Sequence, residues 1–375
     1  MLELRNITKK YKDTLILNNI NLKINKGELV VLIGPSGCGK TTTLKMINKL
    51  ILPTSGEILL NDKNILKEDT IELRRNMGYV IQQTGLFPHM TVAENIGLIP
   101  YVEKWPKEKI VQKVQDLLNM VDMNPEDYMN RYPAELSGGQ QQRIGVARAF
   151  ATDPDIILMD EPFSALDPIT RNQLQDELFN LQQELKKTII FVTHDMDEAI
   201  KLADKICIMN KGLIVQYDTP ENILKNPADE FVAGFVGKDR IWSQPEFIRA
   251  ADIMIREPVK APGSRTLIQG YAQMRNSKVD SVLIVDKDQK LRGIVTMKHL
   301  RLKQEINLRL EEIMTSEIPT VNYDSSLVDI LTVMNEHNLS YIPVTDNSNT
   351  LLGLITKNTL LSVMSSQYLE QEVGQ

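Results

Sequence analysis

The sequence has little cysteine and lacks long hydrophobic runs. Cys38 and Cys207 are the two cysteines among 375 residues. Two are too few for a disulfide framework, so we expect a reducing, cytoplasmic environment. No run reaches the roughly 18 apolar residues that a membrane-spanning helix needs. Residues 1–6 lack the apolar centre of a signal peptide. We therefore predict a chain that does not itself cross a bilayer.

The sequence also lacks an excess of positive charge. It has 43 Lys and Arg against 49 Asp and Glu, a formal net charge of −6. Non-specific binding to nucleic acid is not expected, because phosphate contacts need a basic surface. The hydrophobic content of 42% is that of a globular protein that can bury a large core. At roughly 150 residues per domain, the length predicts two or three domains.

Residues 1 to about 225 alternate between strand-like and helix-like patterns, which predicts an α/β fold with a largely parallel sheet. The predicted strands are short, β-branched and apolar, as strands covered on both faces should be. They lie at Glu28–Ile33, Ile156–Met159, Thr188–Val192 and Ile206–Met209. Residues 108–121 have the apolar spacing of a helix. They belong to a mostly helical stretch, residues 87–150, which we expect to form a helical subdomain.

The carboxyl-terminal part contains an internal repeat with an offset of 60 residues. Ile253-Met254 recurs as Ile313-Met314, and Gly293-Ile-Val-Thr296 recurs as Gly353-Leu-Ile-Thr356. Each copy is predicted to run helix, strand, polar turn, strand, and two copies should pack together because one is too small to close a core.

The predicted domain boundaries follow from these patterns. Proline and glycine mark residues 226–244 as a connecting stretch. We place the first domain at 1–236, a linker at 237–249, the repeats at 250–309 and 310–366, and a tail at 367–375.

The most specific motif is a phosphate-binding loop between a predicted strand and a predicted helix at 41–50. It matches G-x-x-x-x-G-K-[ST] in full. Its residues are Gly34, Pro35, Ser36, Gly37, Cys38, Gly39, Lys40 and Thr41, followed by Thr42. Backbone N–H groups of such a loop surround a triphosphate, and the helix terminus adds positive potential. Lys40 should reach the β- and γ-phosphates, and the Thr41 hydroxyl should bind Mg²⁺. We also expect the helix terminus to lower the pKa of Cys38.

Two further motifs complete the predicted site. The strand at 156–159 ends in Asp160 and Glu161. Asp160 suits the Mg²⁺ shell, and Glu161 suits polarising an attacking water. The second motif, Leu136-Ser-Gly-Gly-Gln, provides Ser137, Gly138, Gly139 and Gln140 at the start of a predicted helix, a second anion-binding terminus. One nucleotide does not need two such termini from one chain, so this one is expected to serve the nucleotide of a partner subunit.

The combination of these motifs resembles the ATP-binding-cassette (ABC) ATPase family over residues 1 to about 235. The resemblance implies ATP and Mg²⁺ as ligands and a head-to-tail homodimer with two shared pockets. It also implies roles for four more positions. Tyr11 would stack on adenine, Gln82 (with Gln83 beside it) would sense Mg²⁺ and the membrane partner, and His194 would contact the γ-phosphate. Ser164–Asp167 resembles the loop that communicates across the dimer.

The resemblance extends to partners. Without a membrane segment of its own, a transport ATPase needs a permease, and an importer also needs a substrate-binding protein. The loop around Phe87–Thr91 is nearly uncharged and is predicted to dock on the permease; packing within the helical subdomain is the alternative. The expected location is the cytoplasmic face of the plasma membrane. Soluble ABC ATPases of DNA repair or translation, and a pure nucleotide sensor, are competing interpretations.

The repeats resemble a tandem pair of α+β CBS domains. A single cassette followed by such a pair resembles the ATPase of importers for glycine betaine, carnitine, choline and related quaternary amines; another small solute is the alternative. The cassette pattern begins at residue 1, which we expect of the betaine/carnitine/choline branch. Nucleotide-binding CBS motifs carry an Asp where this chain has His299 and Thr359. We therefore consider two main roles for the pair: dimerisation alone, or binding of cyclic di-AMP by Tyr341, Ile342, Thr356 and Lys357. A sensor of ionic strength is a third interpretation, which no long run of charge in the tail supports.

Overall fold

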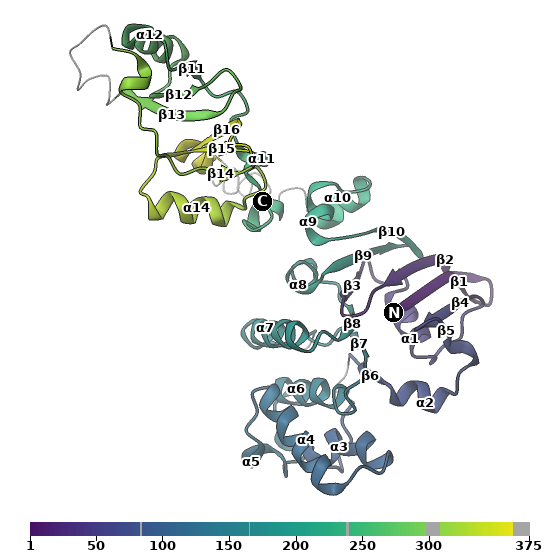
Figure 1. The fold of residues 1–375 in the computed structure, drawn as a ribbon. Helices are drawn as coiled ribbons and strands as arrows, with labels where there is room; N and C mark the ends of the chain where they lie inside the picture. Colours follow the sequence, from purple (N-terminus) through teal and green to yellow (C-terminus); the bar gives the residue numbers. More distant parts are fainter. Residues whose placement is uncertain (83–84, 165, 238–239, 298–307, 363–375) are drawn as a thin grey trace. The chain divides into compact units, whose positions relative to one another are not determined.

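The computed structural model describes residues 1–82, 85–164, 166–237, 240–297 and 308–362. The chain divides into two compact units, Met1–Val236 and Gly237–Gln375, which are described separately. The fold drawn in Figure 1 has the predicted α/β class in the first unit and two small α+β repeats in the second.

A six-stranded sheet forms the centre of the first unit. Its strand order is β10-β9-β3-β8-β7-β6, and all neighbours are parallel except β10 and β9. Every residue of β3, β7 and β8 is buried, which is why these strands read as continuous apolar runs. The largely parallel sheet predicted from the sequence is thus confirmed. The strands are β3 (Leu29–Ile33), β6 (Met77–Val80), β7 (Ile156–Asp160), β8 (Thr188–Val192), β9 (Lys205–Asn210) and β10 (Leu213–Asp218).

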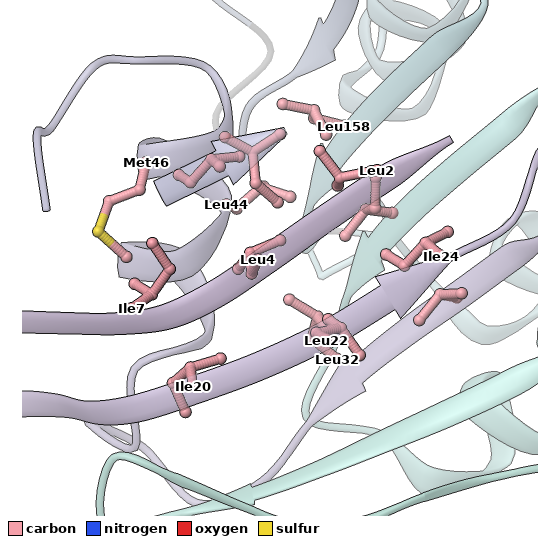
Figure 2. Packing of buried hydrophobic residues seen from close by; sticks show 14 of the residues in the cluster. Leu2, Leu4, Ile7, Ile20, Leu22, Ile24, Leu32, Leu44, Met46 and Leu158 are labelled. Atoms are coloured by element: carbon pink, nitrogen blue, oxygen red, sulfur yellow. The ribbon is translucent and has the colours of Figure 1, made fainter. Parts of the chain in front are cut away.

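A second, antiparallel sheet covers one face of the first, and the sequence patterns did not reveal it. It has the order β2-β1-β4-β5. Its apolar residues pack with those of the central sheet and of α1 in one core. Figure 2 shows part of it, with Leu4 and Leu22 of this sheet, Leu32 and Leu158 of the central sheet and Leu44 of α1. The elements are β1 (Leu2–Tyr11), β2 (Thr14–Ile24), β4 (Ser55–Leu60), β5 (Lys63–Asn64) and α1 (Lys40–Ile47).

A cluster of helices forms one side of the first unit, and its last helix packs against β6 of the central sheet (Figure 1). The amphipathic helix α4 (Lys107–Met120) buries Val114, Leu117 and Leu118, the face predicted from their spacing. The other helical segments of the cluster are α3 (Val92–Val102), α5 (Pro125–Tyr128), η2 (Pro133–Glu135) and α6 (Gly138–Ala149). The predicted helical subdomain is therefore present.

The remaining helices of the first unit follow the strands. They are η1 (Ile65–Lys67), α2 (Thr70–Arg75), α7 (Pro168–Leu185), α8 (Met196–Leu202), α9 (Pro220–Lys225) and α10 (Glu230–Val236). Helix α10 corrects one prediction, because it occupies part of the expected connecting stretch at 226–244. It buries Val232 and Val236, and these apolar contacts make it part of the first unit in spite of Gly234.

Each repeat of the second unit contains the predicted helix and hairpin, plus one short strand that was not predicted. In the first repeat, β11 (Lys260–Pro262) pairs in parallel with β12 (Ser281–Val285), and β12 pairs with β13 (Leu291–Thr296). In the second, β14 (Val321–Asn322), β15 (Tyr341–Thr345) and β16 (Leu351–Thr356) repeat this order. The helical segments are η3 (Arg240–Ser243), α11 (Ala250–Ile253), α12 (Leu267–Ser277), η4 (Leu310–Glu312) and α14 (Leu327–Glu336).

The two repeats share a core, as their small size predicted. Leu283 and Ile294 of the first repeat pack with Leu351 and Leu354 of the second. Each repeat also contacts the other closely at one glycine. A Cβ on Gly293 would lie 2.6 Å from the Thr315 carbonyl oxygen, and one on Gly353 would lie 2.5 Å from the Met254 sulfur. At these equivalent positions only glycine lets the segment that leads into the other repeat approach so closely.

Candidate functional site

The predicted phosphate-binding loop lies between β3 and α1, as its motif requires. Gly34 and Gly39 have φ angles of 153° and 110°, and a Cβ on either would come within 2.3 Å of a neighbouring atom. A Cβ on Gly37 would meet nothing within 4 Å. The loop therefore packs tightly against the protein at Gly34 and Gly39 and is open at Gly37. Helix α1 has no side-chain cap, so the first N–H groups of the helix remain without intrahelical acceptors. This cradle fits an anionic phosphate chain.

Lys40 and Asp160 lie at the base of the cradle. The Lys40 Nζ donates to the carbonyl oxygens of Gly34 at 2.7 Å and Pro35 at 3.2 Å, and the residue is 7% exposed. The Thr41 hydroxyl donates to Asp160 Oδ1 at 2.9 Å. Burial raises the pKa of Asp160, although the bond from Thr41 and the charges of Lys45 and Lys40 oppose the shift. A hydroxyl beside a carboxylate provides the hard oxygen ligands that Mg²⁺ prefers, so these residues fit the expected metal.

Glu161, Gln82 and His194 come together from three neighbouring strands. The Gln82 Nε2 donates to Glu161 Oε2 at 3.0 Å, and His194 Nδ1 lies 3.4 Å from the same oxygen. The backbone of Glu161 is left-handed, with φ 47°, and its N–H donates to the carbonyl of Val192 at 2.9 Å. A non-glycine residue in this conformation is uncommon, and here it turns the chain sharply after β7. The Ser164 hydroxyl donates to the Glu161 carbonyl at 3.0 Å.

The second predicted anion-binding terminus is the start of α6. Ser137 and Gln140 form a reciprocal capping box, and a Cβ on Gly138 would meet nothing within 4 Å. A cavity of about 540 Å³ adjoins these residues, and its other lining residues include Asp167 and Thr170. Gly139 is closed in by Leu166 and Thr170, at 3.3 and 3.2 Å from an added Cβ. Ser137–Gln140 therefore border an open cavity, next to the chain segment that ends with Asp167.

Tyr11 is the last residue of β1 and is 47% exposed. The Lys9 Nζ lies 4.7 Å from the centre of its ring. The ring is thus accessible and already carries a cation–π contact. Its proposed stacking on adenine stays a prediction. Gln83, the neighbour of Gln82, and Ala165, inside the segment Ser164–Asp167, lie outside the described residues.

A buried polar network behind His194 was missed by the sequence analysis. Glu198 accepts hydrogen bonds from Thr193 Oγ1 at 2.5 Å and Gln175 Nε2 at 3.2 Å. Burial raises the pKa of Glu198, and the bond from Thr193 opposes the shift.

Asn95 was also missed by the sequence analysis. It is fully buried and binds the main chain of Phe87, Met90 and Thr91, so it shapes the predicted docking loop. Asn95 is a polar residue among apolar helix positions, and this pattern could have revealed it from the sequence.

Two of the four residues predicted to bind cyclic di-AMP are constrained by packing. Ile342 is fully buried in the core of the second repeat, so its side chain offers no surface for stacking, which corrects that assignment. The Thr356 main-chain N–H and hydroxyl contact the Thr359 hydroxyl. Tyr341 is half-buried and Lys357 is exposed. His299 lies outside the described residues.

The prediction of a low pKa for Cys38 was wrong. The residue is 3% exposed, and burial raises the pKa of its thiol, although the charge of Lys40 opposes the shift. Its side chain packs in the core against β3 and β9 rather than facing the open side of the loop. Desolvation therefore outweighs the helix terminus at this position.

We expect Cys38 to react slowly with iodoacetamide in the folded protein. A raised pKa leaves little thiolate below pH 8, so labelling should be slow there and accelerate as the pH rises. Labelling of a Cys207→Ser variant, followed by mass spectrometry, isolates Cys38, and the same variant in guanidinium chloride is the accessible control. Complete native labelling within minutes at pH 7 would contradict a buried thiol.

Comparisons with known proteins agree with this architecture. The family model described as ABC transporter matches residues 17–164, and the CBS domain model matches 250–304 and 310–366. The glycine betaine/carnitine/choline transport ATP-binding protein OpuCA of Bacillus subtilis is 49% identical, over 100% of this chain and 99% of that protein. The choline transport ATP-binding protein OpuBA of the same organism is 50% identical, over 97% and 96%.

Solved structures resemble the first unit. The dimeric post-hydrolysis structure of the ATP-binding cassette MJ0796 bound to ADP and Pi is 37% identical, with a TM-score of 0.54. The match covers 59% of this chain and 99% of that cassette. The matches to the two Bacillus subtilis relatives span both the cassette and the CBS pair. The chain belongs to the family of ATP-hydrolysing subunits of ABC transporters that carry a carboxyl-terminal pair of CBS domains.

Proposed function

We propose that this protein is the ATPase of an importer for quaternary-amine osmoprotectants such as glycine betaine, carnitine and choline. The observation that carries the proposal is the match to relatives named for these substrates, at 49 to 50% identity over 97% or more of this chain. That span includes the CBS pair as well as the cassette. The protein would act as a homodimer on the cytoplasmic face of the plasma membrane, with permease subunits and a substrate-binding protein as partners. None of the helices in the described ranges has the length and hydrophobicity that spanning a bilayer requires.

The nucleotide would bind in a pocket shared between two subunits. In each chain, the uncapped start of α1 supplies backbone donors and Lys40 for the phosphates, and Ser137–Gln140 of the other chain would close over the γ-phosphate. The open hollow beside Gly138 supports this assignment, because it leaves room for a ligand that this chain does not itself hold. The dimeric cassette with ADP and Pi, to which the first unit is similar, supports it as well.

Within that pocket, Glu161 would act as the general base. Its carboxylate oxygen Oε2 lies between the Gln82 amide and the His194 ring, and these two contacts restrict its position. His194 would contact the γ-phosphate. Thr41, Asp160 and Gln82 would hold Mg²⁺, which when bound neutralises charge on the phosphate oxygens. Lys40 would bind the β- and γ-phosphates, and loss of Lys40 should weaken nucleotide binding itself.

The docking surface for the permease is proposed at the Phe87–Thr91 loop and the groove beside it. Phe87 is 42% exposed and Tyr101 is 74% exposed. An apolar groove of about 600 Å³ runs between α3 and α4 and includes Met90, Tyr101 and Trp105. An exposed apolar hollow of this kind suits the apolar face of a short helix. Asn95 holds the loop at the end of this groove, so the loop and the groove form one surface.

The CBS pair is proposed to regulate transport, with cyclic di-AMP as its ligand. The burial of Ile342 narrows the candidate contacts to Tyr341, Thr356 and Lys357. A hydroxyl and an ammonium group are suited to a phosphodiester, and a half-exposed Tyr to an adenine ring.

Calorimetric titration of the full-length Lys40→Ala variant would test this ligand, because the variant suppresses binding at the ATP site. We expect heat with cyclic di-AMP, its reduction in a Lys357→Ala background, and none with AMP. If neither nucleotide gives heat, dimerisation is the function that remains for the pair.

For the transport function, we expect a strain that lacks this gene to lose glycine betaine uptake and to recover it with the wild-type chain. A Tyr101→Glu variant should fail to restore uptake while it keeps ATP binding, because it places a charge in the docking groove. Leu52→Glu, at an exposed position outside the groove, is the control. Normal uptake in the deletion strain would point to another solute.

We expect Glu161→Gln to bind ATP and dimerise but to hydrolyse it roughly 100-fold more slowly, since an amide cannot accept the proton of water. Steady-state phosphate release measures the rate, and gel filtration with ATP measures dimerisation. Glu72→Gln, on the exposed side of α2, should hydrolyse ATP normally. Hydrolysis at the wild-type rate by Glu161→Gln would move the base elsewhere, with His194 the next candidate.

Mixed dimers test whether the pocket is shared. When Lys40→Ala is on one subunit and Ser137→Arg on the other, a shared arrangement keeps one pocket intact. When both changes are on one subunit and its partner is wild-type, both pockets are damaged. We therefore expect one trapped ATP per dimer in the first case and none in the second. Pockets built from single chains would give the reverse pattern.

A further inference from the structure

We propose that Glu198 is a positioning residue for hydrolysis. Through its bond with Thr193 it fixes the main chain around His194. Through α7 it also connects His194 to the segment that ends with Asp167. The inference rests on the proposed role of His194 and adds a residue to it. Glu198 lies on α8, is 7% exposed, and is placed behind the catalytic edge of the sheet rather than on it.

The Thr193 hydroxyl links Thr193 to Asp195, the two residues that flank His194 in the sequence. It donates to Glu198 Oε2 at 2.5 Å and accepts from the Asp195 N–H at 3.0 Å, while the Thr193 N–H donates to the Leu32 carbonyl at 3.3 Å. Thr193 is 2% exposed. Because the hydroxyl is engaged on both sides, the turn that carries His194 has one preferred conformation, and Glu198 is the acceptor that orients the hydroxyl.

The His194 ring itself has few restraints. The side chain is 66% exposed, and its Nδ1 lies 3.4 Å from Glu161 Oε2. Its direction is therefore determined mainly by the main chain of the turn. A displacement of about 1 Å at a reacting group can lower the rate about 100-fold, so a loosened turn would affect catalysis even when the ring is chemically intact.

The same carboxylate connects to α7. Glu198 Oε1 accepts from Gln175 Nε2 at 3.2 Å and lies 4.0 Å from Arg171 Nε. Arg171 donates from a terminal nitrogen to the Leu166 carbonyl at 3.0 Å, and its other terminal nitrogen is 3.9 Å from Asp195. Arg171 thus contacts both the turn of His194 and the segment that resembles the dimer-communication loop. A movement of either segment would be transmitted to the other through the Arg171 side chain.

The test compares Thr193→Val, Glu198→Ala and Thr193→Ser in the full chain. We expect Thr193→Val and Glu198→Ala to lower kcat at least tenfold with the KM for ATP within about threefold, because the phosphate-binding loop is untouched. Thr193→Ser, which keeps the hydroxyl, should recover most of kcat. Thr188→Val is the matched control. It removes another buried hydroxyl, at the start of β8, the strand that leads into Thr193. This hydroxyl accepts from the Gly27 N–H, and its loss should change thermal stability without changing kcat.

Two readouts separate positioning from folding. The chain has four histidines, so the His194 ring resonance can be assigned by substitution in histidine-labelled protein, and it should shift in Thr193→Val but not in Thr188→Val. In addition, kcat of Thr193→Val/His194→Ala should equal that of His194→Ala alone, since the hydroxyl acts through the ring.

The outcomes are distinguishable. If His194→Ala keeps full activity, the proposed role of the histidine fails, and this inference with it. If His194→Ala is impaired but Thr193→Val has a normal kcat and an unshifted ring resonance, only the positioning role is overturned. A further loss of kcat when Thr193→Val is added to His194→Ala would likewise exclude action through the ring.

Discussion

Parallel pairing of β6, β7, β8 and β3 brings the residues of the proposed hydrolytic site to one edge of the central sheet. Leu32 pairs with Val192, which pairs with Asp160, and Met159 pairs with Val80. The loop glycine, His194, Glu161 and Gln82 each follow one of these paired residues by one or two positions. Register therefore determines the site, because a shift of one residue in any of these strands would turn its side chains to the opposite face and move the residues that follow it out of alignment.

The two helix termini proposed to bind phosphate, the starts of α1 and α6, differ in how their N–H groups are hydrogen-bonded. At α1 a glycine occupies the cap position and leaves the donors free of side-chain acceptors. At α6 the Ser137 hydroxyl already accepts from Gln140, so this helix is stable before it meets a ligand. The first terminus is thus suited to hold a nucleotide, and the second to approach one that is bound elsewhere. This difference agrees with a pocket assembled from two chains.

Most of the fold and of the candidate site that could be predicted depended on residues close together in the sequence. The loop at 34–41, the acidic strand end and the 60-residue repeat are local patterns, and the structure places their strands and helices as expected. The antiparallel sheet of β1, β2 and β4 was missed because its register is interrupted by bulges that break the alternation. The Cys38 prediction failed for a related reason: burial depends on β9, far away in sequence, whereas the helix terminus is local. The network of Glu198 also joins segments that sequence spacing does not connect.

The reciprocal glycines of the second unit have a consequence for the stability of each repeat. Gly293 accommodates the segment that leads into the second repeat, and Gly353 accommodates the segment that leads into the first. Each copy covers one face of its sheet with its own helix, but Leu283, Ile294, Leu351 and Leu354 are buried where the two copies meet. A single copy would expose its half of this apolar surface to water, so the covalent link keeps each copy beside the partner that its stability requires.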